Sequence, residues 1–270
     1  MENKFLKIDG VNIHYYCEGQ GDVVVLLHPS PRNSKMMAPL MNLLSPHFFV
    51  IAPDLPGYGY SDALPQRIIS LYDYVPYLHT LITNITQAPV RLYGTATGAQ
   101  LAIAYGLTNC EKVQHLYLDN AAHFEEEAYD NILKNYFPDL SKQKDGSHLQ
   151  KIWNLVCDSC LYFPWYEKNE SHRIANELPV EKTIQAIVND YLLAGENYAD
   201  AYIAAFKHER AENVQQLKCD TTIFKWLGSP ILNHINTLLS FNFSGNIQTV
   251  ETPKDMKKRY EVMVAKIKLS

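Results

Sequence analysis

One turn of the chain has the residue types and spacing that chemistry at a sheet edge requires. Residues 90–93 are mainly apolar, residues 94–98 read Gly-Thr-Ala-Thr-Gly, and an Ala- and Leu-rich run follows. This pattern predicts a buried strand, a tight turn and a buried helix. Glycines at both ends let the helix pack close to the strand, so the side chain at position 96 should stand exposed over the sheet edge. The helix N-terminus favours negative charge there, but the methyl group of Ala96 cannot attack a substrate.

Three histidines and an arginine could contribute polar groups to such a site. His28 and His123 each come shortly after an apolar run, and ligands of open α/β sheets bind at strand ends, so both are candidate catalytic residues. A structural role is the alternative for each. Arg32 could hold a substrate carboxylate and His148 could face a binding pocket, with a solvated surface position as the alternative.

An aromatic group could line an apolar pocket, although packing within a core is the alternative. The residues considered for substrate binding there are Tyr162, Phe163 and Trp165. Cys157 and Cys160 have the spacing of a metal or redox motif, but no second Cys/His pair accompanies them at metal-ligand spacing. We therefore expect neither a metal site nor a cofactor.

Alternating strands and helices must position these residues. A hairpin is predicted over residues 4–16, and strands are predicted over residues 23–27, 48–52, 90–93, 113–118, 221–226 and 247–250. Helices are predicted over residues 36–44, 71–85, 231–239 and 254–267. Such alternation predicts an α/β protein whose mainly parallel sheet has helices on both faces.

One segment breaks this alternation. From residue 124 to residue 210 the pattern is helical and rich in aromatic residues, which predicts an inserted helical lid. The remaining residues, 1–123 and 211–270, would form the α/β core. The lid is expected to cover a pocket above Ala96.

The composition limits the kinds of partner. The chain has 270 residues, 47% hydrophobic and 20% charged, with a formal net charge of -5, as in a folded protein with ample core. No basic stretch predicts nucleic-acid binding, and no apolar run is long enough to span a membrane. Five irregularly spaced cysteines and an N-terminus without an apolar signal region predict a cytoplasmic protein with reduced thiols, either a monomer or a homodimer.

Three motifs, in this order, resemble those of the α/β-hydrolase superfamily. Residues 28–31, His-Pro-Ser-Pro, resemble its His-Gly-x-Pro oxyanion loop, with proline in place of glycine. Residues 52–62 resemble its D-x-x-G-x-G-x-S loop, in which Asp54 and Asp62 are expected to hold the loop geometry. Residues 94–98 resemble the nucleophile elbow, Gly-x-Ser-x-Gly. The resemblance covers nearly the whole chain and implies the α/β-hydrolase fold.

The resemblance also implies roles for two backbone amides. In the family, the x residue of the oxyanion loop and the residue after the nucleophile donate to a developing oxyanion. Ser30 and Thr97 occupy these positions, so both are candidate catalytic residues through their main chain. Each donor of this kind contributes roughly 3–4 kcal/mol in hydrolases.

A narrower resemblance concerns a bacterial subgroup of this superfamily. Its elbow reads Gly-Thr-His-Thr-Gly-Ala, which is similar to residues 94–99 except that Ala96 stands in place of the histidine. Residues 145–149 and 163–165 resemble that subgroup as well. The resemblance leaves open that Ala96 is a substitution in an enzyme with an unusual residue at this position.

The family's Ser-His-Asp triad is missing from its expected places. Position 96 is alanine, residues 227–230 after one strand hold no carboxylate, and residues 251–255 after the last strand hold no histidine. Because the triad needs all three groups in one hydrogen-bonded line, we predict that the protein does not use it.

Three functional hypotheses remain at this point. The first is an enzyme that uses the hydrolase pocket without a covalent nucleophile, such as a cyclase, lyase or isomerase acting on an apolar carbonyl compound. The second is a non-catalytic protein that binds a small ligand. The third is an alanine variant of an unusual hydrolase-like enzyme. In each case the partner is a small molecule.

Overall fold

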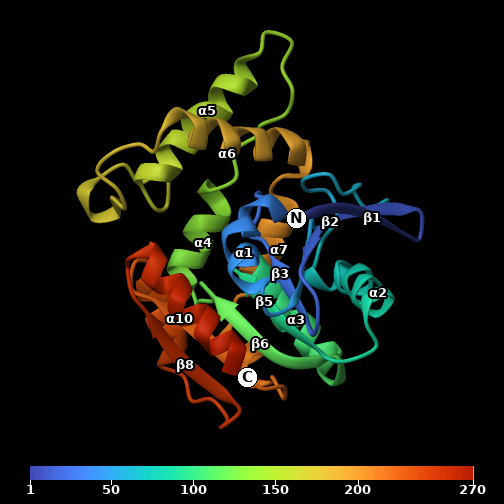
Figure 1. Ribbon diagram of the computed structural model, residues 1–270. Helices are drawn as coiled ribbons and strands as arrows, with labels where there is room; N and C mark the ends of the chain where they lie inside the picture. Colours follow the sequence, from blue (N-terminus) through green and yellow to red (C-terminus); the bar gives the residue numbers. More distant parts are fainter. Residues whose placement is uncertain (270) are drawn as a thin grey trace.

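A mainly parallel sheet forms the centre of the computed structural model, which describes residues 1–269 (Figure 1). The sheet has eight strands in the order β1-β2-β4-β3-β5-β6-β7-β8. β1 pairs antiparallel with β2, and β2 pairs antiparallel with β4; the other neighbours are parallel. The α/β-hydrolase fold predicted from the sequence is confirmed.

The elements lie close to their predicted positions. The strands are β1 (Glu2–Ile8), β2 (Val11–Glu18), β3 (Val23–Leu27), β4 (Phe49–Pro53), β5 (Val90–Thr95), β6 (Val113–Asp119), β7 (Thr221–Trp226) and β8 (Ile247–Thr252). The helices are α1 (Ala38–Leu44), α2 (Val75–Ile85), α3 (Thr97–Thr108), α4 (Glu126–Asn135), α5 (Ser147–Leu161), α6 (Glu181–Ala194), α7 (Asp200–His208), α8 (Ala211–Gln215), α9 (Leu232–Leu239) and α10 (Met256–Leu269).

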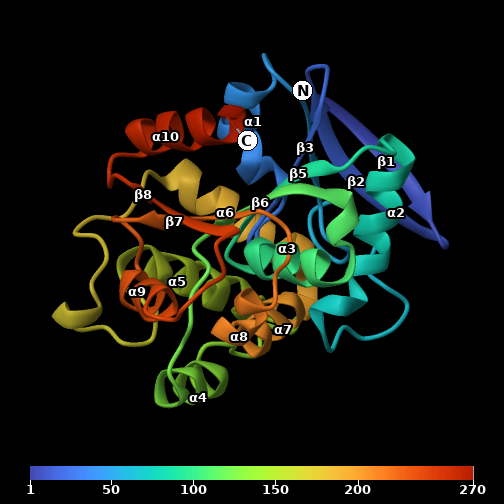
Figure 2. The ribbon, with the colours of Figure 1, turned by 90° about the horizontal axis from the view of Figure 1, so that it is seen from below.

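Burial on both faces explains the continuous apolar runs. All five residues of β3 are buried, and their side chains alternate between two cores. Val24 and Leu26 pack with side chains of α1 and α10, whereas Val25 and Leu27 pack with those of α2, α3 and α8. Figure 2 shows α1 and α10 on one side of the sheet and α3 and α8 on the other.

The segment between β6 and β7 is the one that leaves the alternating pattern. It carries α4, α5, α6, α7 and the short α8, and α5 packs beside α6. In Figure 1 these two helices lie at one end of the molecule, beyond the sheet. Residue 270, the last of the range assigned to the core, lies outside the described residues.

Within residues 1–269, no helix is both long enough and apolar enough to cross a bilayer.

Candidate functional site

The turn between β5 and α3 keeps a strained backbone at an alanine. Ala96 has φ 48° and ψ −115°, and residues other than glycine rarely adopt so positive a φ. Its amide donates to the carbonyl oxygen of Asp119 at 2.9 Å, which ties the turn to the end of β6. Such a conformation costs on the order of 1–3 kcal/mol and persists only where the surroundings impose it. The predicted elbow is therefore present, with a methyl group at its apex.

Glycine is required on both sides of this turn by close backbone contacts. A Cβ atom on Gly94 would lie 2.1 Å from the carbonyl oxygen of Gly98, and one on Gly98 would lie 2.3 Å from that of Leu27. Helix α3 therefore approaches β5 and β3 at backbone contact. Thr97 is the first residue of α3, where an amide has no hydrogen-bond partner within its own helix.

Ser30, the second predicted donor, lies in the loop after β3. The residue is buried, and its peptide bond to Pro31 is cis. Within residues 1–269 its amide donates to no main-chain oxygen. β3 and β5 are parallel neighbours, so Ser30 and Thr97 follow adjacent strands at the same edge of the sheet.

His28 is held in place through both ring nitrogens. Nδ1 lies 3.0 Å from the carbonyl oxygen of Pro29, and Nε2 accepts a hydrogen bond from the Leu55 amide at 3.0 Å. The proton therefore belongs on Nδ1, and no ring nitrogen is left for a substrate. Burial lowers the pKa of His28, which keeps the ring neutral. These contacts argue against the catalytic role considered from the sequence and for the structural alternative.

Two aspartates of the sequence motifs hold the loop between β4 and α2 in place through hydrogen bonds. The buried carboxylate of Asp54 accepts from His14 Nδ1 at 2.6 Å and from the amide of Ser34 at 2.7 Å. Asp62 accepts from the side chain of Asn12 at 2.7 Å. Both contacts bind the loop to β2 and its neighbours, in agreement with the structural role predicted for these residues.

Another buried carboxylate, at the end of β6, is paired toward α10. Asp119 Oδ2 accepts from the Tyr93 hydroxyl at 2.6 Å and from Nη2 of Arg259. The Arg259 guanidinium lies 4.2 Å from the centre of the Trp226 ring. The charge of Asp119 is therefore balanced by Arg259 on the face covered by α10. This pairing argues against a role of Asp119 as the acid of a catalytic triad at the elbow.

The loops that hold the acid and base of a triad in this fold contain other groups here. After β7, Ser229 Oγ donates to Asn120 Oδ1 at 2.7 Å. Asn120 follows β6 with φ 50°, and its Nδ2 lies 3.5 Å from Thr95 Oγ1. After β8 the chain has Lys254, which is exposed. Thr95, Asn120 and Ser229 contain no group that titrates near neutral pH, so this polar chain cannot replace an imidazole–carboxylate pair.

His123 and His148 stabilise backbone segments at two different places. His123 Nδ1 accepts from the Ala211 amide at 3.0 Å, and its ring centre lies 4.8 Å from that of Phe241. His148, in the first turn of α5, accepts from the Gln143 amide at 3.1 Å. Among the described residues, no hydrogen bond or ring contact joins either histidine to the elbow.

The aromatic group divides into two parts. Tyr162 pairs with Arg173 through an isolated β-bridge, and the guanidinium lies 4.9 Å from the tyrosine ring centre. Trp165 Nε1 donates to the carbonyl oxygen of Tyr136 at 3.0 Å, and the ring centre of Phe163 lies 6.1 Å from that of Tyr136. The Tyr136 ring also contacts Phe137, Tyr166, Tyr202 and Phe206. For Phe163 and Trp165 these contacts favour the core alternative.

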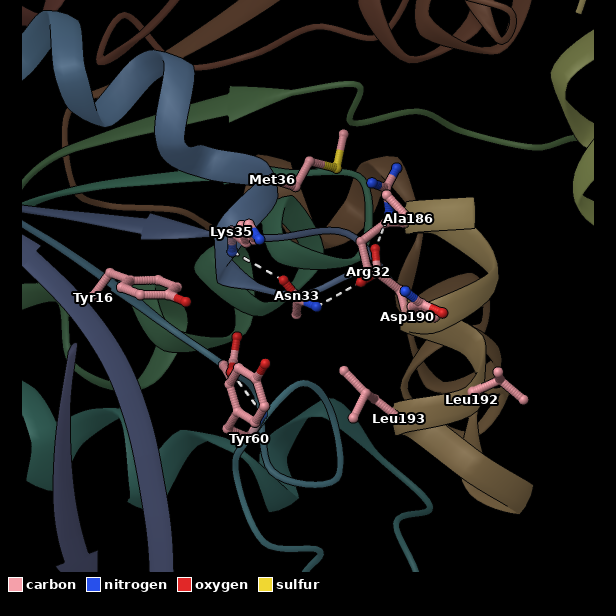
Figure 3. A pocket seen from close by; sticks show the side chains of 12 residues that line it. Tyr16, Arg32, Asn33, Lys35, Met36, Tyr60, Ala186, Asp190, Leu192 and Leu193 are labelled. Atoms are coloured by element: carbon pink, nitrogen blue, oxygen red, sulfur yellow. Dashed lines mark hydrogen bonds and ion pairs between the residues drawn. The ribbon is translucent and has the colours of Figure 1, made fainter. Parts of the chain in front are cut away.

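Arg32 joins the loop after β3 to α6. Its Nε donates to Asp190 Oδ2 at 2.5 Å, and Nδ2 of Asn33 donates to Oδ1 of the same carboxylate at 2.6 Å (Figure 3). A cleft of about 610 Å³ lies beside this pair, between the loop and α6. The guanidinium is already paired with a carboxylate of the chain itself, which argues against the predicted contact with a substrate carboxylate.

A buried polar cluster behind the elbow helix was not found from the sequence. Glu209 Oε1 accepts from the Ala122 amide at 3.0 Å and from Gln100 Nε2 at 3.3 Å, while Gln100 Oε1 lies 3.1 Å from Nδ1 of His208. Burial raises the pKa of Glu209 to about 8 and lowers the pKa of His208 to about 4. Near pH 7 the cluster is therefore mostly uncharged. Its one sequence signal is the polar Gln100 inside an apolar helix pattern.

Comparison with known proteins agrees with this fold. Residues 22–155 match a family model described as the alpha/beta hydrolase fold. The chain is similar to the (E)-2-((N-methylformamido)methylene)succinate hydrolase of Acinetobacter baylyi, with 28% identity over 110 residues, 41% of each protein. It is also similar to a soluble epoxide hydrolase of Corynebacterium sp., with 28% identity over 111 residues, 41% of this chain and 38% of that protein.

A solved structure matches over a longer stretch. The epoxide hydrolase of Vigna radiata superposes with a TM-score of 0.73 at 16% identity, covering 100% of this chain and 98% of that chain. Identity this low supports the shared fold alone. The matches to the two curated hydrolases span only about two fifths of the length of each.

Proposed function

Because the chain belongs to the α/β-hydrolase superfamily, we propose that it acts on a small carbonyl compound without a covalent nucleophile. Cyclisation, elimination and isomerisation are reactions of this type, because none of them requires an acyl-enzyme. The observation that carries the proposal is the strained backbone of Ala96, with φ 48° and ψ −115°. The turn keeps its hydrolase geometry although the side chain that attacks in hydrolases is absent.

The strain supports a function for the turn itself. A backbone cost of about 1–3 kcal/mol is usual at sites where the geometry serves binding or catalysis. Without a nucleophile, the turn still offers the Thr97 amide at the start of α3 as a hydrogen-bond donor. The Ser30 amide in the adjacent loop is the second donor. Two such donors would polarise a carbonyl group and stabilise negative charge on its oxygen.

We propose that the helical segment between β6 and β7 acts as a lid. Arg32 and Asn33 hold Asp190 of α6, which fixes one of its helices to the loop that carries Ser30. A lid attached in this way would shield a bound carbonyl from water and strengthen its interaction with the amides.

Hydrolysis is the competing proposal, since the similar curated proteins are named as hydrolases. It would require a nucleophile or an activated water at the elbow. In the loops that hold the acid and the base of such enzymes, this chain has Ser229 and Lys254 instead, and His28 has both ring nitrogens engaged. These residues favour the non-hydrolytic proposal.

The experiment compares ester and epoxide hydrolysis by the native protein with that by Ala96→Ser and Ala96→His. We expect p-nitrophenyl acetate and styrene oxide to react at background rates with all three proteins. In Ala96→Ser no base would take the proton of the serine, and in Ala96→His residues 227–230 provide no carboxylate to orient the imidazole. The histidine variant tests whether Ala96 replaces an unusual catalytic residue. Turnover well above background by the native protein would contradict the proposal, and turnover gained by Ala96→His would support the hydrolase alternative.

Binding without turnover is a second candidate, favoured by the hydrogen bonds that engage His28 and His123. A ligand that co-purifies with the protein separates the two. Its conversion to a new product during incubation supports an enzyme, whereas its recovery unchanged after many hours supports a binding protein.

We also propose a cytoplasmic location. All five cysteines are free thiols, which agrees with a reducing compartment.

A further inference from the structure

A second cleft opens at the same edge of the sheet, beyond the elbow. Its volume is about 420 Å³, and it lies where the ends of β7 and β8 meet the inserted helical segment. The lining comes from residues 171–174, residues 227–230, Phe163, Leu232, Asn233 and Lys254. In Figure 2 the loop that carries residues 171–174 runs beside α9. The cleft thus occupies the loops that hold the acid and base of a triad in this fold.

The charge on this lining has one sign. Arg173 and Lys254 contribute positive charges, and the lining residues that the structure describes include no aspartate or glutamate. Arg173 forms one ion pair, with Glu170 at 3.0 Å, but the Glu170 side chain is 84% exposed, so solvent weakens that attraction. Lys254 forms no ion pair within residues 1–269. The cleft therefore carries positive charge that the protein largely leaves uncompensated.

The Asn233 side chain lines the same cleft as these two cations and contributes an amide donor. The hydroxyl groups of Ser171 and Ser229 also line it, but they donate to Asn169 Oδ1 and Asn120 Oδ1. Asn233 is also the second residue of α9, where a backbone amide has no partner within the helix, and the N-cap residue Ile231 provides no side-chain cap. The positive end of the helix adds to the attraction of an anion, although the two side-chain cations are the main contribution.

We propose that this cleft binds a phosphate monoester, through Arg173 and Lys254, as the anionic group of a small metabolite. Two cations together with the amide donor of Asn233 suit a compact dianion better than a single carboxylate. Ser229 connects the cleft through Asn120 to Thr95, the residue before the elbow apex. The inference does not depend on the reaction at Ala96, because it concerns a different part of the sheet edge.

The test measures binding of inorganic phosphate by isothermal titration calorimetry at pH 7.5 and low ionic strength, with acetate as the monoanionic comparison. We expect phosphate to bind more tightly than acetate, and Lys254→Gln and Arg173→Gln each to weaken phosphate binding by about tenfold, as loss of a charge-assisted hydrogen bond does. Lys257→Gln is the matched control, since Lys257 is an exposed lysine outside the cleft. Melting temperatures establish that the variants are folded.

Nuclear magnetic resonance locates the bound ion. The amide resonance of Asn233 should shift on addition of phosphate in the native protein and shift less in Lys254→Gln. Equal weakening by Lys257→Gln, equal affinity for acetate, or the absence of phosphate binding would overturn the inference. The Ala96→Ser variant should bind phosphate like the native protein, so a failure at the elbow and a failure at this cleft are distinguishable.

Discussion

Position 96 decides how the chain can use its fold. An alanine there removes the nucleophile but leaves the main-chain conformation of the turn, because that conformation is set by Gly94, Gly98 and the hydrogen bond to Asp119. The sequence allowed this to be predicted, since the glycine spacing and the flanking apolar runs are local features. The elbow therefore separates two properties, a reactive side chain and a strained backbone.

The strain at Ala96 leads to a stability prediction. Ala96→Gly should stabilise the protein by about 1 kcal/mol, because glycine accepts φ 48° without the steric cost that alanine bears. Ala99→Gly, three residues into the buried part of α3, should destabilise it by about 1 kcal/mol through lower helix propensity. Urea unfolding of both variants measures the difference. A loss of stability in Ala96→Gly similar to that in Ala99→Gly would mean that the turn is not strained.

The roles of single polar residues were harder to predict. His28 was a candidate for catalysis because of its place after β3, but its Nε2 is engaged by the amide of Leu55, 27 residues later. Arg32 was a candidate for substrate binding, but its partner Asp190 is 158 residues away. Spacing along the chain does not report contacts between distant segments, so these outcomes required the three-dimensional arrangement.

At the scale of elements, the strands and helices were predictable and their mutual packing was only partly so. The apolar runs of β3 and β5 and the periodicity of α2 gave their positions within a few residues. The glycine box also predicted close packing of α3 on the sheet. The aromatic cluster around Tyr136 was not predicted, because its members come from several parts of the inserted segment.

The contact of α3 with the sheet can be tested through Gly98. Gly98→Ala should destabilise the protein by about 3 kcal/mol or prevent its folding, because the new Cβ would lie 2.3 Å from the Leu27 carbonyl oxygen and main-chain atoms would have to move. Gly245→Ala is the control: no atom lies within 4 Å of its Cβ position, so its stability should change by less than about 0.5 kcal/mol. Thermal unfolding compares the two. Tolerance of Gly98→Ala would contradict the close approach of helix and strand.

At the scale of the whole molecule, buried ionisable groups set how stability depends on pH. Burial raises the pKa of Glu209 from 4.5 to about 8, so the folded state retains a proton that the unfolded state loses, and stability falls as pH rises through this interval. Burial lowers the pKa values of His115 and His208 from 6.5 to about 4, so stability rises with pH between those values.

These opposing effects predict a maximum of stability near pH 6.5. Below it the two histidines outweigh Glu209, and above it Glu209 outweighs the two histidines, so the free energy of unfolding should fall by about 1 kcal/mol between pH 6.5 and pH 8. Urea unfolding at both pH values measures this change. Glu209→Gln keeps a hydrogen-bond acceptor without the titration, so the fall should disappear; an equal fall in that variant would contradict the assignment.

The distribution of charge over the whole molecule could not be predicted from the sequence either. The net charge of -5 gives no sign of a positive cleft. Arg173 and Lys254 are 81 positions apart in the numbering, and only the folded chain brings them to one cavity. The fold class was therefore predictable from local patterns, whereas the second cleft was not.

We propose that two oxyanion amides are present at an elbow that has no nucleophile. The most direct measurement is a crystal structure at a resolution that shows ordered water, determined with and without acetate. We predict one oxygen atom above Cβ of Ala96, from water or from acetate, at roughly 2.7–3.1 Å from the amide nitrogens of both Ser30 and Thr97. Amides that point to different places, or a side chain that fills this position, would contradict the claim.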